Sequence, residues 1–341
     1  MIRALHRCRL NAAMILVAAL ALLAPSARAG EPIRIGVVRS MGGSPSIIAK
    51  EKGFFAAEGL DAELTLFDSA QPIAVAVASG DCQFGATGMT AAFFNLASQG
   101  VLRILGAGTW EHAKFHSVGM VVSNQAHAAG LRAFKDLGGH SIGITQLGSP
   151  LQYFALQIAE KYGIDGKSLR FLALQSNGNV ASSIAGNQVD AAVQTAAPIS
   201  AIVEKGDGKL LGWTADELPP RQGEAVFTAT AVANARPETV KHFMAALRRA
   251  DRHLHDAFVD EKGQRREGAA AEEALTIVAK YLDQPLAAIR PGMPYFDPEA
   301  RTAVKDIAAL MAWYKAQGMM KGDATAEALI DRRYAIEMPA K

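Results

Sequence analysis

Two stretches of this chain repeat one plan: a short apolar strand, a turn of small residues and the start of a helix. The first runs from Ile35 into Gly43-Ser44-Pro45, and the second runs from Ile142 into Gly148-Ser149-Pro150. In each stretch the pattern predicts Ser as the N-cap and Pro at the first helical position. Short, wholly apolar strands are typical of a parallel sheet that is covered on both faces. The repeat therefore predicts two similar lobes facing a shared cleft.

Each of the two turns is also a candidate site for an anion. The first N–H groups of a helix have no partner within the helix, and the helix dipole places partial positive charge there. Ser44 and Ser149 are expected to face each other across the cleft. Capping of an ordinary helix explains the same two residues without any ligand.

Strand and helix patterns alternate along most of the chain. This alternation predicts parallel sheets with helices on both faces. A strand near 226–232 could return to the first lobe, and the pattern after Pro237 is helical. The expected strands are 35–38, 61–67, 84–86 and 102–107, then 118–122, 142–145, 169–174, 191–193 and 210–213; the expected helices include 47–58, 73–78, 237–258, 269–281 and 298–317.

The first 29 residues have the three parts of a secretory signal peptide. A basic start is followed by the apolar run 12–23, and Ala27-Arg28-Ala29 matches a small-x-small cleavage site. We therefore expect cleavage after Ala29 and a periplasmic location. A retained N-terminal anchor is the alternative, although the apolar run is short for a membrane span.

Removing that segment reverses the sign of the net charge. It contains four Arg residues and no acid, so Lys+Arg falls from 35 to 31 against 33 Asp+Glu, which gives −2. No basic excess then remains to attract nucleic acid or anionic lipid. Cys82 is the one cysteine left after cleavage, and we expect a buried structural thiol there.

Two motifs point weakly to catalysis or to metal binding. Gly139-His140-Ser141-Ile142-Gly143 matches the G-x-S-x-G elbow of serine hydrolases, but that elbow needs a strand before the Ser, and here the strand follows it. We expect Ser141 to be catalytically silent. His112 and His116 have i, i+4 spacing but follow a strand, so solvated or hydrogen-bonded side chains are expected instead of metal ligands.

The loops at the carboxyl ends of the predicted strands carry the candidate ligand-binding residues, because ligands of open α/β sheets bind at that edge. They comprise hydrogen-bonding groups, one cation and apolar side chains, with no acid–base pair, which favours recognition over catalysis. The candidates are Arg39, Met41, Ser44, Thr87, Gly88, Met89, Trp110, Gln146, Ser149, Asn177 and Thr195.

Four segments resemble signatures of the nitrate/sulfonate/taurine-type substrate-binding proteins of ABC transporters, the SsuA/THI5-like family. They are the opening 33–61, the segment Ala78-Ser79-Gly80-Asp81 through Gly88, the lobe-two entry 136–143, and 186–191. The resemblance spans residues 31–250. One departure is Gln194-Thr195-Ala196-Ala197-Pro198, where many members carry an aromatic and an acidic residue before the Pro.

The resemblance implies an α/β, two-lobed periplasmic binding protein of type II, the Venus-flytrap form, with mixed sheets flanked by helices and a ligand cleft between the lobes. It implies a first lobe from 31–117, a second lobe from 118–232 with hinge strands at both ends, and completion of the first lobe by 233–341 and its C-terminal helices. The implied partners are a small-molecule ligand and an inner-membrane ABC permease with its ATPase. We expect a monomer that needs no cofactor or metal and does not bind nucleic acid.

The expected ligand is a small organic anion such as a sulfonate, a taurine-like or nitrate-like solute, or a carboxylate. If it is anionic, Arg39 should contribute roughly ten- to a hundredfold in affinity, and Trp110 and Met41 could pack against an apolar body. An aromatic carboxylate or a thiamine-pyrimidine-like heterocycle remains open. The alternative from another class is an enzyme: a secreted hydrolase using Ser141, or a relative of the pyrimidine-synthesising enzymes of this fold.

Overall fold

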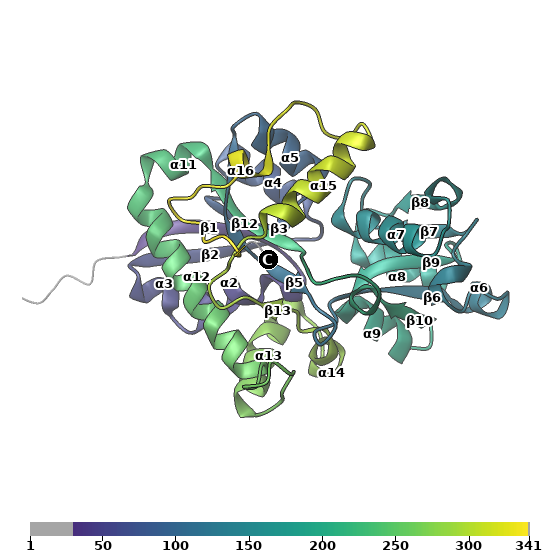
Figure 1. Ribbon diagram of the computed structural model, residues 1–341. Helices are drawn as coiled ribbons and strands as arrows, with labels where there is room; N and C mark the ends of the chain where they lie inside the picture. The colour runs from purple at the N-terminus through teal and green to yellow at the C-terminus, as the bar shows by residue number, and fades with distance from the viewer. Residues whose placement is uncertain (1–29, 340–341) are drawn as a thin grey trace, which may run out of the picture.

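The protein has two α/β lobes that lie side by side (Figure 1). The computed structural model describes residues 30–339. The predicted signal peptide and its cleavage site lie outside these residues. Ile35 and Ile142 belong to two separate five-stranded sheets, so the predicted two-lobed α/β architecture is confirmed.

The first sheet has the strand order β2-β1-β3-β12-β4. β1, β2 and β3 are parallel, whereas β12 is inserted antiparallel between β3 and β4. The strand predicted to return to the first lobe therefore does so, and the sheet is mixed. The bounds are β1 Glu31–Val38, β2 Leu60–Phe67, β3 Phe84–Gly88, β4 Leu102–Ala107 and β12 Glu224–Ala229.

Helices cover both faces of the first sheet. One core centres on Phe243 and Ile47, and the other on Phe227 and Tyr314, all of them fully buried. Burying large apolar side chains of this kind stabilises by about 1.5–3 kcal/mol each. The first face carries α2 Ser44–Glu51, α3 Phe54–Ala57, α12 Pro237–Phe258 and α13 Ala269–Leu282, and the second carries α4 Gln71–Ser79, α5 Ala91–Ser98, α15 Val304–Ala316 and α16 Ala326–Leu329. α11 Thr230–Ala235, α14 Leu286–Ile289 and the turn η4 Arg290–Gly292 connect these layers.

The second sheet repeats this design with the order β10-β6-β9-β7-β8. β7, β8 and β9 are parallel, and β6 runs antiparallel to β9 and β10. The strands are β6 Val118–Ser123, β7 Ser141–Ile144, β8 Arg170–Ala173, β9 Ala191–Thr195 and β10 Gly208–Trp213. The helices are α6 Asn124–Ala128, α7 Pro150–Lys161, α8 Asn177–Ala185, α9 Ala196–Glu204 and α10 Thr214–Glu217, with the short turns η2 Phe134–Asp136 and η3 Gly166–Ser168.

A third, three-stranded sheet lies where the chain crosses between the lobes (Figure 1). β5 (Thr109–Glu111) leads out of the first sheet, and β11 (Arg221–Gln222) leads back toward it. The two crossing strands pair antiparallel, and β13 (Tyr295–Phe296) pairs with the other edge of β5. The crossings are thus hydrogen-bonded to each other. The lobe bounds 31–117, 118–232 and 233–341 stay a prediction.

Three predicted elements differ from those in the structure. The helix expected over 47–58 is broken at Gly53, whose φ of 69° ends α2 before α3 begins. The returning strand stops at Ala229, because Thr230 begins α11. The helix expected from Pro298 begins only at Val304, since the Asp297 carboxylate accepts N–H bonds from the following turn.

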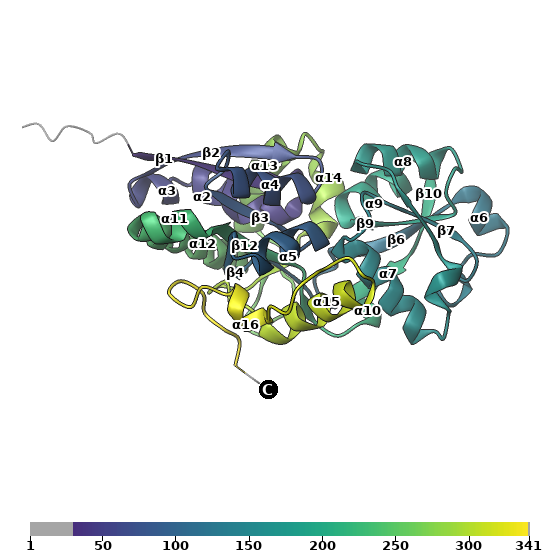
Figure 2. The same ribbon diagram turned by 90° about the horizontal axis from the view of Figure 1, so that it is seen from above.

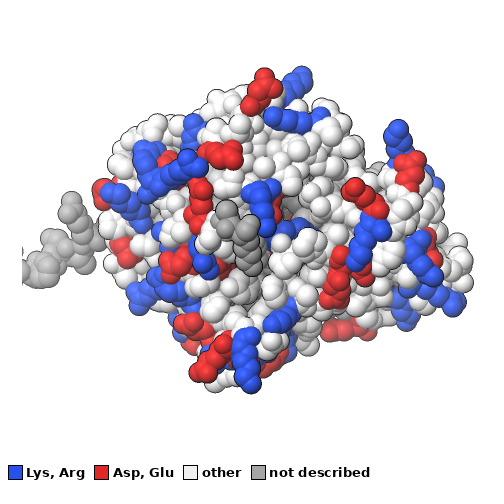
Figure 3. Space-filling view, viewed as in Figure 1, with Lys and Arg blue, Asp and Glu red and all other residues white. Residues whose placement is uncertain are grey.

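No helix in residues 30–339 combines the length and the apolar character of a membrane span. Lys and Arg side chains are interspersed with Asp and Glu over the face shown in Figure 3. This face therefore presents no broad field of one sign.

Candidate functional site

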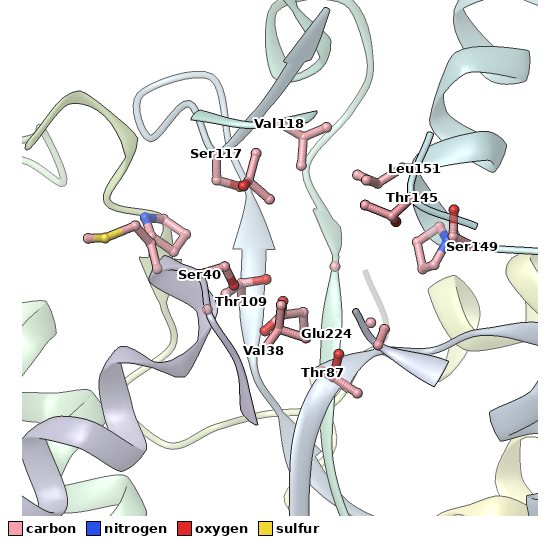
Figure 4. A pocket seen from close by; sticks show the side chains of 18 of the residues that line it. Val38, Ser40, Thr87, Thr109, Ser117, Val118, Thr145, Ser149, Leu151 and Glu224 are labelled. Atoms are coloured by element: carbon pink, nitrogen blue, oxygen red, sulfur yellow. The ribbon is translucent and has the colours of Figure 1, made fainter. Parts of the chain in front are cut away.

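A cavity of about 110 Å³ lies between the lobes, at the carboxyl ends of β1, β3, β7 and β9 (Figure 4). Both sheets bring the ends of their parallel strands to this edge, which is where α/β proteins bind ligands. The walls combine hydroxyl, amide and carboxyl groups with apolar side chains. They are formed by Val38, Ser40, Met41, Gly42, Asp68, Ser69, Ala70, Thr87, Gly88, Thr109, Glu111, Ser117, Val118, Thr145, Gln146, Ser149, Pro150, Leu151, Phe154, Asn177, Thr195, Gly223, Glu224, Gly292 and Pro294.

Seven of the predicted site residues line this cavity, and they come from both lobes. Met41, Thr87 and Gly88 belong to the first sheet's turns and strand ends, and the others to the second lobe. Those from the second lobe are Gln146, Ser149, Asn177 and Thr195.

The second turn has the predicted form. Ser149 is the N-cap of α7 and its hydroxyl accepts the N–H of Gln152, with Pro150 at the first helical position. The Gln152 side chain in turn accepts the N–H of Gly148 at 2.8 Å. This network fixes the N-terminus of α7 at the cavity wall.

The first turn differs, and the predicted N-cap at Ser44 is wrong. The 3₁₀ turn η1 (Met41–Gly43) follows β1, so Gly43 is the N-cap and Ser44 is already the first residue of α2. Ser44 is completely buried, and its hydroxyl donates to the Met41 carbonyl at 2.6 Å. Ser44 does not line the cavity, so the two serines do not face each other across it.

Three further candidates lie outside the main cavity. Arg39 has a side chain that is 44% exposed, lies 3.7 Å from the Asp68 carboxylate, and lines a neighbouring cavity that shares Ser40, Asp68 and Asn177 with the main one. Met89 is buried in the core of the first lobe. Trp110 is buried within β5, where it pairs with Gln222 and Tyr295 and packs beside the cavity wall without forming part of it.

Several polar atoms on the cavity walls have no hydrogen-bond partner among residues 30–339. Thr87 is the most buried of these residues, with 1% of its surface exposed. Buried polar atoms are nearly always paired in folded proteins, so a group of orphans in one cavity calls for an explanation. The atoms are Thr87 Oγ1 and Glu224 Oε2 on the first lobe, and Gln146 Nε2 and Thr195 Oγ1 on the second.

Glu224, the first residue of β12, is a cavity residue that our sequence analysis missed. It pairs with Gly88 across the sheet, so its side chain enters at the end of β3 (Figure 4). Burial, and secondarily the charge of Glu111, raise the pKa of Glu224 to about 7. The sequence pattern places the site at the carboxyl ends of the strands. Because β12 is antiparallel, its amino end lies at that same edge.

Glu111 is a second acid on the wall, and it is satisfied. The Ser117 hydroxyl donates to its Oε1, and the Thr214 hydroxyl lies 3.2 Å from its Oε2. Burial raises the pKa of Glu111, an effect that the Ser117 hydrogen bond and the Arg221 charge oppose. Glu111 lies on one crossing strand and Arg221 on the other, so this cluster ties the crossings together.

The lobes touch on one side of the cavity. The backbone N–H of Ala91, at the start of α5, donates to the Gly148 carbonyl at 3.0 Å. The rings of Tyr153 on α7 and Trp313 on α15 lie 5.2 Å apart, and Figure 2 shows these two helices side by side. The two lobes are therefore in direct contact beside the cavity.

The remaining motifs lie apart from the cavity. Ser141 begins β7, at the amino edge of the sheet, and its hydroxyl donates to Asp190 at 2.8 Å. His140 lies 3.3 Å from the same carboxylate, so the acid sits between Ser and His, whereas a catalytic triad places His between Ser and the acid. His116 bonds to Asp216, and residues 30–339 contain no group of three or more metal-ligating side chains. Cys82 is buried, as predicted.

The chain matches known proteins over most of its length. The model of the family described as NMT1/THI5 like matches residues 43–256. A protein of Brucella abortus (strain 2308) named "Putative binding protein" is 27% identical over 226 residues, which cover 64% of this chain and 66% of that protein, just under two thirds of its length.

Solved structures show the same fold. The alkanesulfonate-binding protein SsuA of Xanthomonas axonopodis pv. citri, bound to MOPS, has a TM-score of 0.70 at 20% identity, covering 88% of this chain and 97% of that one. The desulfurization enzyme DszB has a TM-score of 0.60 at 14% identity, covering 88% and 96%. The fold thus occurs in both a binder and an enzyme. With the family model matching more than half of its 341 residues, this chain belongs to the NMT1/THI5-like family and has the two-lobed fold of the periplasmic binding proteins.

Proposed function

We propose that this protein is the substrate-binding component of an ABC importer: it captures a small molecule between its lobes in the periplasm and delivers it to the permease. The observation that carries the proposal is the cavity, whose unpartnered polar atoms come from both lobes. A molecule that hydrogen-bonds to both walls stabilises a closed arrangement of the lobes, and hinge closure around a ligand is the motion known for such receptors. The apolar leader supports the periplasmic location.

A small organic anion is one candidate ligand. It is supported by the N-terminus of α7 at the wall and by the relative that binds alkanesulfonate. No Lys, Arg or His of residues 30–339 lines the main cavity. Such an anion would therefore be held by N–H and hydroxyl groups and not by a charged side chain.

A heterocycle with polar ring substituents is the second candidate. Phe154 offers an aromatic wall, and Glu224 offers an acceptor for an N–H group. A buried hydrogen-bonding group of this kind discriminates strongly between ligands, because the wrong ligand leaves it unpaired.

An enzyme that uses Ser141 is the remaining alternative. The hydroxyl is held by Asp190 at the opposite edge of the sheet from the cavity, which argues against it. Esterase activity that Ser141→Ala abolishes would support this alternative.

Binding is tested by thermal shift of the purified protein with sulfonates, nitrate, aromatic carboxylates and pyrimidines, followed by calorimetry of the best compound. We expect one class to raise the melting temperature and to bind with a stoichiometry of about one per chain. A protein that binds none of these compounds would contradict the proposal.

A further inference from the structure

We infer that Glu224 is the group that recognises a hydrogen-bond donor on the ligand, so that the molecule carried in the cavity bears an amino, ammonium or ring N–H group. The inference rests on the proposed function and narrows its ligand class.

The first support is that the protein makes room for this side chain. A Cβ at Gly42 would lie 2.7 Å from the Glu224 carboxyl carbon, and one at Gly108 would lie 2.9 Å from its Cβ. Distances under 3 Å are not tolerated between such atoms, so any larger residue at either position would displace Glu224. Gly42 therefore keeps the space that the carboxyl group occupies, and Gly108 keeps the space beside the base of the same side chain.

The second support is that Glu224, unlike the other two acids of the cavity, has a carboxyl oxygen without a partner among residues 30–339. Asp68 lies beside the Arg39 guanidinium, and Glu111 accepts from the hydroxyls of Ser117 and Thr214. Within the described part of the chain, no hydrogen bond or ion pair reaches Glu224 Oε2, although that atom is buried. A buried carboxyl oxygen without a donor is costly, and a donor on the ligand would remove that cost.

The third support is the charge of the whole cavity. Three carboxyl groups line it, those of Asp68, Glu111 and Glu224, and no basic side chain in residues 30–339 does so. A simple anion would bring further negative charge close to these groups and would leave Glu224 unpaired. A ligand with a positive or N–H-bearing end would instead place a donor beside the buried Glu224 carboxyl group.

The opposite wall indicates what the other end of the ligand offers. Within residues 30–339, the amide NH₂ of Gln146 and the hydroxyl of Thr195 have no hydrogen-bond partner, and both belong to the second lobe. An acceptor on the ligand would satisfy the amide donor. The best fit is a small molecule with a donor at the Glu224 end and an acceptor at the Gln146 end, because it bonds to both lobes at once.

The test compares matched compounds on the full-length mature protein. 2-Aminoethanesulfonate and ethanesulfonate share an anion and differ in the ammonium group, and 4-aminopyrimidine and pyrimidine differ in the amino group. We screen these pairs within two thermal-shift libraries, one of amines and amino-heterocycles and one of anions without N–H groups. We expect binders to come from the first library and their donor-free partners to bind at least about tenfold more weakly.

Variants then assign the effect to Glu224. Glu224→Gln should weaken the best amino compound by about ten- to a hundredfold, while Glu63→Gln, a change on the exposed face of β2, should leave its affinity unchanged. If the Gln variant does not fold, Glu224→Asp is tested instead, because it moves the carboxylate away from the ligand. This variant should bind the amino compound more weakly and a donor-free compound with unchanged affinity.

Binding of a donor-free anion with equal affinity to the wild type and to Glu224→Gln would overturn this inference and leave the proposed function intact. A protein that responds to neither library would overturn the proposed function, and the inference would fall with it.

Discussion

The two strand–turn–helix units look alike in sequence but play different parts in the structure. In the second unit, Ser149 caps α7 and forms part of the cavity wall. In the first unit, Ser44 lies inside α2, is fully buried, and its hydroxyl donates to the carbonyl of Met41 in its own turn. The first lobe meets the cavity instead through Ser40, Met41 and Gly42, one turn earlier in the chain.

Loop length explains the difference. Residues 39–43 separate β1 from Ser44, and residues 145–148 separate β7 from Ser149, so the first loop is one residue longer. The longer loop folds into η1 before α2 begins, and its residues Met41 and Gly42 line the cavity in place of the start of α2. A shared Gly-Ser-Pro motif therefore does not by itself specify a shared site.

The largest difference between the two units is expected in how the stability of their surroundings depends on pH. Glu224 packs against the first turn, whereas residues 145–150 of the second turn contain no ionisable side chain. The pKa of Glu224 is raised from 4.5 to about 7, so the unfolded chain releases this proton first as pH rises. The contribution of Glu224 to the free energy of unfolding is therefore fully present below about pH 4.5 and is lost as the pH rises through about 7. The loss is at most about 3 kcal/mol, because solvent in the cavity screens part of the charge.

Denaturant unfolding at about pH 5 and about pH 8 measures this effect. Comparison with Glu224→Gln cancels the contributions of Glu111 and of the other acids. The wild type should lose more stability than the variant over this interval. Equal losses would mean that Glu224 has an ordinary pKa.

Substitution of one glycine in each turn should cost stability for different reasons. Gly42→Ala places a Cβ 2.7 Å from the Glu224 carboxyl carbon, and such overpacking costs about 1–3 kcal/mol. Gly148→Ala forces a φ of 68° on alanine, which costs about 1–2 kcal/mol.

A double-mutant cycle separates the two causes. In a Glu224→Ala background the cost of Gly42→Ala should largely disappear, and that of Gly148→Ala should persist. If both costs persist, the carboxyl group does not occupy the space beside Gly42.

The two serines give a smaller and more selective contrast. Ser149→Ala removes an N-cap, at a cost of about 1 kcal/mol, and alters the cavity wall. Ser44→Ala removes one buried hydrogen bond, at a cost of about 0.5–1.5 kcal/mol, away from the cavity. Calorimetry with the best ligand should show weaker binding for Ser149→Ala alone. Equal weakening by both variants would contradict the difference between the turns.

The smallest effect is expected from Arg39→Ala. The side chain is exposed and its ion pair with Asp68 is long, so stability should change by less than about 0.5 kcal/mol. Because Arg39 lies outside the main cavity, binding should change by less than about twofold. A tenfold loss would restore the contact expected from the sequence and would favour an anionic ligand.

Much of the fold follows from local signals in the sequence. An apolar run predicts β4, and a helical pattern predicts α12, with the bounds that the structure has. Thr90 and Ser149 act as N-caps where small polar residues precede helices. Such signals depend on neighbours within one or two turns of the chain, so sequence patterns report them directly.

The site was harder to predict because it depends on contacts between distant segments. Trp110 follows a strand end, as a ligand-binding residue would, but its pairing with β11 and β13 buries it. Glu224 begins a strand, and only the insertion of that strand between β3 and β4 brings its carboxyl group to the cavity. Neither pairing partner can be identified from a local pattern.

The central position of β12 also has a consequence for how the chain acquires its structure. The strands of the second sheet all lie within residues 118–213, so that sheet can be completed from one continuous segment. The first sheet needs β12 between β3 and β4, and this strand follows the whole second sheet in the sequence. Pairing over such long sequence separations is slow. Until β12 is inserted, β3 and β4 each keep an unpaired inner edge, although β1, β2 and β3 can already pair with one another. An unpaired strand edge of this kind favours aggregation before the first lobe is complete.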